Sequence, residues 1–199
     1  MENNIISKCF GHLKTIIIHK HYVFINCCKA GIIWRGIKHD LSKFYPIEFG
    51  ESIKYYTGTR SPIDNCKDAK GYSMAWLHHK GRNTHHYEYW VDYLDKGGIP
   101  IQMPYKDALE MVCDYLAAGM VYSKNAGKEF SYKDEYDGFW KTKSIDNPIA
   151  MHPQTKMFVT LMLRRMKKEN SNDCLRKCES LKLYKQASRI IEGKDEEII

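Results

Sequence analysis

In the stretch Ile37-Lys38-His39-Asp40-Leu41-Ser42-Lys43-Phe44, a histidine and an aspartate stand side by side. His19 precedes this pair, and Asp114 follows it further along the chain. Imidazole and carboxylate ligands together suit a divalent transition metal such as Mn, Fe, Co, Ni or Zn, whereas oxygen ligands alone would suit Ca or Mg. The ordered set His19, His39, Asp40 and Asp114 therefore predicts a metal site.

A second group of histidines lies between Asp40 and Asp114, in the stretch His78-His79-Lys80-Gly81-Arg82-Asn83-Thr84-His85-His86. These imidazoles are more than a single metal ion can use. They are also hard to explain as core packing, because a buried neutral ring needs partners for both of its nitrogens. The cluster therefore favours a second metal position, held by His79 and by one or both of His85 and His86.

These phrases, together with Met111-Val112-Cys113-Asp114, resemble the HD-domain superfamily of metal-dependent phosphohydrolases. They are most similar to an uncharacterised bacterial and phage family of HD-like proteins, and the resemblance covers roughly residues 12–122. It implies a helical fold and a metal centre with one or two ions, and it favours His79 over His78 as a ligand. It does not imply a substrate.

Apolar residues recur at helical spacing along nearly the whole chain, which predicts an all-α fold. The resemblance implies that this fold is an HD-domain-like helical bundle, here with a C-terminal helical extension. Residues 1–125 are expected to form the metal-binding core, and residues 126–199 a connecting segment and C-terminal helices packed on the same domain. Residues 57–71 are predicted to be a surface loop because Gly, Pro, Asp and Asn gather there. A lid over the site is one role that such a loop could have. The predicted helices cover residues 5–29, 33–41, 47–56, 72–79, 85–94, 104–122, 153–168 and 172–191.

Two of the proposed ligands can also be explained without a metal. His19 falls beside Ile16 and Val23 on the inward stripe of the first predicted helix, where a histidine can simply bond a carbonyl group. Asp114 lies on a largely apolar face, and burial of a lone carboxylate requires a metal or a cationic partner. Arg35 and Arg82 are the candidate cations.

Basic side chains near the predicted ligands are candidates for binding substrate. Lys43, Lys80 and Arg82 could hold phosphate oxygens, arginine as a planar fork and lysine as a point charge. Lys43 ranks first because it belongs to the resembled phrase and lies about one helical turn beyond Asp40. Asn83 is predicted either to contact substrate or to cap a helix that begins near residue 85.

Catalysis is assigned to Asp40, Lys43 and Glu48. Glu48 either orients a ligand histidine or serves as a general base. His12 is expected to be a surface residue or to lie behind the ligands.

Charge and composition restrict the class of protein. The net charge is +7, with 31 Lys and Arg against 24 Asp and Glu, which favours anionic ligands. No apolar run reaches the roughly 18 residues of a membrane helix, so no membrane contact and an intracellular, cytoplasmic location are expected. The seven cysteines form no disulfide framework and are predicted to be free thiols.

The sequence thus predicts a metal-dependent phosphohydrolase that acts on a small phosphorylated molecule, with a nucleotide as one candidate. A first alternative is a di-iron oxygenase, since some HD proteins use the same ligand set to activate dioxygen. A second alternative is a non-enzymatic basic helical module that binds nucleic acid or a protein. The binding affinity of such a module would fall steeply as the salt concentration rises. The oligomeric state is left open.

Overall fold

The structure is a computed structural model and describes residues 4–94, 97–143 and 149–195. Over these residues the fold is helical apart from one antiparallel hairpin of β1 (Val91–Leu94) and β2 (Gly97–Pro100), so the all-α prediction is confirmed. The α-helices are α1 (Ile5–Ala30), α2 (Ile33–Lys38), α3 (Pro46–Tyr55), α4 (Pro62–Lys70), α5 (Met74–Lys80), α6 (Tyr105–Asn125), α7 (Tyr132–Lys143), α8 (Pro153–Glu169) and α9 (Lys177–Ile191). Short 3-10 helices cover Leu41–Phe44 (η1), Tyr87–Trp90 (η2) and Asp173–Leu175 (η3).

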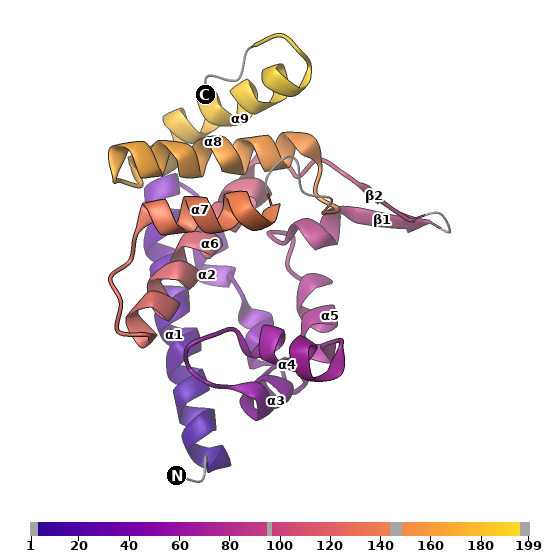
Figure 1. Ribbon diagram of the computed structural model, residues 1–199, viewed down its shortest axis with the longest axis vertical. Helices are drawn as coiled ribbons and strands as arrows, with labels where there is room; N and C mark the ends of the chain where they lie inside the picture. Colours follow the sequence, from indigo (N-terminus) through magenta and orange to yellow (C-terminus); the bar gives the residue numbers. More distant parts are fainter. Residues whose placement is uncertain (1–3, 95–96, 144–148, 196–199) are drawn as a thin grey trace.

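The long helix α1 forms one side of the molecule and runs from the N-terminus toward α8 and α9, which lie together at the opposite end (Figure 1). Helices α3, α4 and α5 gather beside the N-terminal half of α1, and the β1–β2 hairpin projects away from the helices (Figure 1). Helix α6 packs against α1 and runs in the opposite direction (Figure 1): Asn26 near the end of α1 donates to the carbonyl of Cys113, and His19, earlier in α1, contacts Asp114. The ligand-bearing segments thus surround the space between α1 and α6.

Helix α1 has clear local signals at both ends. Asn4 accepts a hydrogen bond from the N–H of Ile6 at the start. Gly31, with φ of 72°, ends the helix in the left-handed conformation that glycine adopts without strain. The helix therefore ends where the sequence predicts, and it buries His19 while His21 stays exposed.

The helix predicted over residues 33–41 ends earlier than expected. Helix α2 stops at Lys38, and Asp40 takes φ of 52° and ψ of 29°, a left-handed conformation that aspartate tolerates better than most residues. The chain then turns into η1. His39 and Asp40 therefore lie in a sharp turn between two short helices, not on one continuous helix.

Three other predictions of local structure are wrong. The predicted loop 57–71 contains α4, because Pro62 starts a helix at its first position and Gly71 ends it. The predicted helix 85–94 is instead η2 and β1, where valine and tyrosine pair with a glycine-containing strand. The connecting segment predicted to follow residue 125 contains α7.

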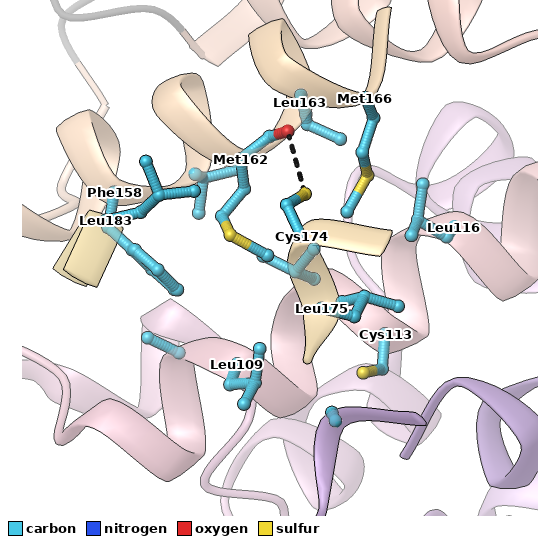
Figure 2. Packing of buried hydrophobic residues seen from close by; sticks show 14 of the residues in the cluster. Leu109, Cys113, Leu116, Phe158, Met162, Leu163, Met166, Cys174, Leu175 and Leu183 are labelled. Atoms are coloured by element: carbon cyan, nitrogen blue, oxygen red, sulfur yellow. Dashed lines mark hydrogen bonds between the residues drawn. The ribbon is translucent and has the colours of Figure 1, made fainter. Parts of the chain in front are cut away.

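The hydrophobic core joins both halves of the chain. Val23 of α1 and Leu109 of α6 belong to the same buried cluster as Met162 of α8 and Leu183 of α9. Figure 2 shows residues of α8, η3 and α9 packed over α6, with the Cys174 thiol donating to the carbonyl of Met162 at 3.7 Å. This core fixes α6, and thereby Asp114, against α1.

Candidate metal centre

One group of potential ligands joins three segments of the chain. His19 comes from α1, His39 and Asp40 from the turn after α2, and Asp114 from α6. His19 Nε2 lies 2.9 Å from Asp114 Oδ1 and 3.7 Å from Asp40 Oδ2. His39 Nε2 lies 3.2 Å from Asp40 Oδ2 and 3.3 Å from Asp114 Oδ1. The four predicted ligands thus converge, with ligand atoms all within 4.8 Å of one another.

The second group of potential ligands faces the other carboxylate oxygen of Asp40, Oδ1. His79 Nε2 is 3.3 Å and His85 Nε2 is 3.4 Å from Asp40 Oδ1. His86 completes this group, and its ring centroid is 4.2 Å from that of His85 and 4.9 Å from that of His79. Asp40 is therefore shared between two sets of ligands, and its two oxygens face different sets.

The chemistry of the buried atoms fits a metal. Six of the nitrogen and oxygen atoms in these two groups are buried and make no hydrogen bond of acceptable geometry, although Asp40 Oδ2 also has the Lys43 ammonium beside it: His19 Nε2, His39 Nε2, Asp40 Oδ1, Asp40 Oδ2, His85 Nε2 and His86 Nε2. Native proteins leave few buried polar atoms unsatisfied, so such a cluster needs an explanation. Coordination of a metal ion would satisfy these atoms together.

Glu110, which lies one turn before Asp114 on α6, stands behind both groups. Its Oε1 is 2.9 Å from Nδ1 of His39 and 3.4 Å from Nδ1 of His85, the nitrogens that face away from Asp40. Arg35 holds the other oxygen, Oε2, at 2.8 Å. Carboxylates in this position fix the tautomer and the ring orientation of ligand histidines. One carboxylate therefore orients a ring of each group.

Glu48 has the same relation to His79. Its Oε2 lies 2.8 Å from His79 Nδ1, and its Oε1 lies 2.5 Å from Nδ1 of His78. Ser42 donates to Glu48, and Asn83 donates to Ser42 and to the carbonyl of His79. Glu48 is thus placed to orient a ligand, and Asn83 braces the same ring without capping a helix.

Within the two groups, the imidazoles and the carboxylates shift each other's pKa values. Burial raises the pKa of the Asp40 carboxyl, but His39, Lys43 and His79 outweigh this effect and hold the pKa well below its ordinary value. Burial lowers the pKa of His39, but the carboxylates of Asp40, Asp114 and Glu110 raise it well above the ordinary value. Despite burial, the carboxylates also raise the pKa of His79 and His85, so without a metal these three rings favour protons, which metal binding would displace.

His19 and His86 differ from the other rings of the two groups. Burial, helped by Lys43, lowers the pKa of His19. Burial, together with His85 and His79, holds the pKa of His86 well below the ordinary value. The neutral imidazole that these shifts favour is the state that binds a metal.

A family model matches residues 8–165, which include every residue of both groups. The chain belongs to a family of unknown function, DUF5662. No curated protein and no solved structure matches the chain.

A cavity of about 350 Å³ opens beside the two groups. It is bounded by α1 on one side and by α6 on the other, and α4 and α5 line it as well. Its walls include His19, His79, His86 and Asp114 of the two groups. This volume lies within the range of small-molecule sites.

Lys43 is the predicted substrate residue that reaches this cavity. Its ammonium lies 2.5 Å from Asp40 Oδ2, and its side chain is 26% exposed. Burial lowers the pKa of Lys43, but Asp40 and Asp114 raise it above the ordinary value. The side chain therefore stays charged beside the shared aspartate.

The other predicted substrate residues do not line this cavity. Arg82 and Asn83 line a second depression, which also reaches His39 and His85. Lys80 points its ammonium over the ring of Tyr93 at 5.7 Å. Arg35 pairs with Asp107 and Glu110, so it does not neutralise Asp114.

The described residues include no helix with a stretch of apolar residues sufficient to span a bilayer.

Sequence reasoning missed Glu110 and misplaced His12. The spacing of Glu110 and Asp114, four residues apart on one helix, signals a shared face. His12 is buried and lines the cavity, so it is not a surface residue. Its spacing of seven residues from His19, two helical turns, also signals a shared face.

Proposed function

We propose that this protein is an HD-type, metal-dependent phosphohydrolase with a dinuclear centre, acting on a small phosphorylated molecule such as a nucleotide. The observation that carries the proposal is Asp40, whose two carboxylate oxygens face two separate sets of ligands. A carboxylate shared by two sets of ligands is an arrangement that suits a pair of divalent ions. The cavity beside it supplies room for a substrate.

Each residue of the site would have a distinct role. His19, His39 and Asp114 would hold one ion, His79, His85 and His86 the other, and Asp40 both. Bound divalent ions such as Mn, Fe, Co, Ni or Zn supply a Lewis acid for the phosphoryl group and lower the pKa of attacking water. Lys43 lines the cavity and would offset negative charge on the phosphoryl oxygens. Glu110 and Glu48 would hold the rings in place.

A di-iron oxygenase remains a second candidate, because two adjacent sets of histidine and carboxylate ligands also suit a pair of iron ions. The identity of the productive metal separates the two activities. Phosphate release with Mn or Co and without oxygen supports hydrolysis. Oxygen consumption that requires iron supports the second candidate.

The basic C-terminal helices support a nucleic-acid module less well. Arg165 pairs with Glu169, Lys167 with Asp137, and Lys182 with Glu179, so much of their charge is compensated locally.

The test starts with metal analysis of protein purified without a chelating tag. We expect about two transition-metal ions per chain. The protein loaded with Mn, Co, Ni, Zn or Fe would then be screened for phosphate release from a panel of phosphorylated metabolites. Retention of two ions with no phosphate release under any loading would reject the hydrolase and leave the metal centre.

A further inference from the structure

The cavity continues along α1 well beyond the candidate metal centre. His12 and His19 lie on the same face of α1 and both line the cavity, seven residues apart. At 1.5 Å per residue this separation is roughly 10 Å along the helix axis. Ile16, between them on α1, and Val121 of α6 line the space. A ligand with its phosphoryl group at the metal centre can therefore extend to His12.

His12 is held rigidly at this distal end. The residue is 6% exposed, and its ring lies against Phe49 and Tyr56 with centroids 5.4 and 5.5 Å away. Tyr56 is fixed in turn, because its hydroxyl lies 2.8 Å from that of Thr15. Gly11 allows this packing, since a Cβ there would lie 2.7 Å from the Tyr56 ring.

The ring of His12 has hydrogen-bonding capacity that the protein does not use. Its Nδ1 is buried and has no partner at hydrogen-bonding geometry. Burial and the nearby ammonium of Lys43 lower the pKa of His12 to about 4, so the ring is neutral at physiological pH. A neutral imidazole offers one donor and one acceptor, and it does not attract an anion.

The start of α4 lines the same cavity and adds donors. Ser61, the residue before the helix, makes no capping hydrogen bond with its side chain, and Ser61, Pro62, Ile63 and Asp64 all line the cavity. The N–H groups of Ile63 and Asp64 therefore lack the usual side-chain acceptor. The Asp64 carboxylate stands beside them and disfavours an anionic ligand group. Lys67 of α4 also lines the cavity, but its ammonium lies over the Trp76 ring, 4.5 Å from the centroid.

We propose that the distal end of the cavity binds an uncharged, hydrogen-bonding group of the substrate, such as a hydroxyl or an amide, with His12 as the residue that determines specificity. The substrate is then a phosphorylated molecule with a neutral polar group roughly 10 Å from the phosphoryl group, the distance set by two turns of α1. This inference rests on the proposed function, since it places the phosphoryl group at the metal centre.

Three phosphonates with the same six-carbon chain test the distal end. Hexylphosphonate ends in a methyl group, 6-hydroxyhexylphosphonate in a hydroxyl group, and hexane-1,6-bisphosphonate in a second anion. Their binding to the Mn-loaded protein would be measured by titration calorimetry. We expect the hydroxyl compound to bind about 2- to 10-fold more tightly than hexylphosphonate, the gain of one hydrogen bond, and more tightly than the bisphosphonate.

Variants of α1 assign the effect to His12. His12→Leu should abolish the advantage of the hydroxyl compound, and His12→Gln, which keeps a donor and an acceptor, should restore part of it. His21→Leu changes an exposed histidine on the same helix and should leave the series unchanged. Metal content should stay at the wild-type level in all three variants.

Several results would overturn the inference. These are equal binding of the three compounds, tightest binding of the bisphosphonate, no binding at all, or an advantage that survives in His12→Leu. If His12→Leu does not fold, the binding order of the three compounds on the wild-type protein still tests the inference. Phosphonates are not hydrolysed, so the binding series is independent of turnover. Preference for the hydroxyl compound without any phosphatase activity would reject the proposed function and keep the distal site.

Discussion

Asp40 turns its carboxylate back onto the ring of its own neighbour, with Oδ2 3.2 Å from His39 Nε2. Successive side chains on an α-helix diverge by about 100°, so a continuous helix would separate these two groups. The left-handed conformation of Asp40 changes that direction. It also leaves Oδ1 facing His79 and His85, which makes Asp40 the link between the two sets of ligands.

Replacement of Asp40 should therefore affect both sets at once. In Asp40→Ala we expect the loss of both metal ions and of activity, because each set loses a carboxylate ligand. Metal content per chain, measured by mass spectrometry on untagged protein, checks this. Asp137→Ala, which removes an exposed aspartate, is the matched control. Full metal retention in Asp40→Ala would show that Asp40 does not bind the ions.

Changes in the histidine cluster should affect one set alone. In His79→Ala, or in the double variant His85→Ala/His86→Ala, we expect metal content to fall from about two ions to about one per chain, while the set of His19, His39, Asp40 and Asp114 stays occupied. His78→Ala should retain both ions, since His78 contacts Glu48 and belongs to neither set. A wild-type content of one ion would rule out the dinuclear centre.

The sequence predicts more of the site than of the connections around it. The first set of ligands is recognisable because the residue types and their order can be read directly from the sequence. This set is His19, His39, Asp40 and Asp114, and helical spacing places His19 inward. The turn at Asp40 is not visible in this way, since its left-handed backbone depends on what packs around it. The hairpin after residue 90 is likewise decided by pairing across the chain.

The supporting residues and the cavity were harder to predict for a related reason. Glu110 acts through Arg35 and two histidines from distant segments, and single-sequence patterns do not show such partners. Helix α4, predicted as a loop, packs against α3 and lines the cavity together with residues of α1 and α6. Arg82 was chosen for its charge and its place near the ligands, but the turn after α5 directs it to another depression.

Glu110 should control the affinity of both metal positions without binding an ion itself. Glu110→Gln keeps the size of the side chain but weakens the acceptor that faces His39 and His85. We expect about a 10- to 100-fold loss of metal affinity, the usual cost of removing such a supporting carboxylate. Competition with a chelator of known affinity would measure it, and Glu169→Gln, at an exposed ion pair, is the control. Unchanged affinity would leave Glu110 a purely structural role.

Lys43 should matter for turnover more than for metal binding. Lys43→Met keeps the aliphatic stem but removes the charge beside Asp40. We expect metal affinity to be maintained or increased, because a repelling cation is lost, and phosphatase turnover to fall by at least about 10-fold, because charge stabilisation is lost. Metal titration and steady-state kinetics on the same preparation separate the two effects. Wild-type turnover would show that Lys43 does not act on the substrate.

Glu135 of α7 gives a prediction about stability that is independent of the metal. Its carboxylate lies directly against Gly119 of α6, where an added Cβ would collide with Oε1. Burial, helped by Asp134, raises the pKa of Glu135 to about 7. The folded protein thus holds a proton that the unfolded chain releases near its ordinary pKa of about 4.3. The free energy of unfolding should therefore fall as pH rises from about 4.3 to about 7, and no further above that.

Glu135→Gln should remove this part of the pH dependence. The amide stays neutral at all pH values, so the variant should be more stable than the wild type at pH 8 and similar to it at pH 4. We expect a gain of about 1–2 kcal/mol, reduced for solvent screening because the side chain is partly exposed. Urea unfolding of metal-free protein across pH 4 to 8 measures the difference. Glu129→Gln, at an exposed position, should show no such gain. A constant difference between Glu135→Gln and wild type at all pH values would mean that the carboxylate is ionised in the folded protein.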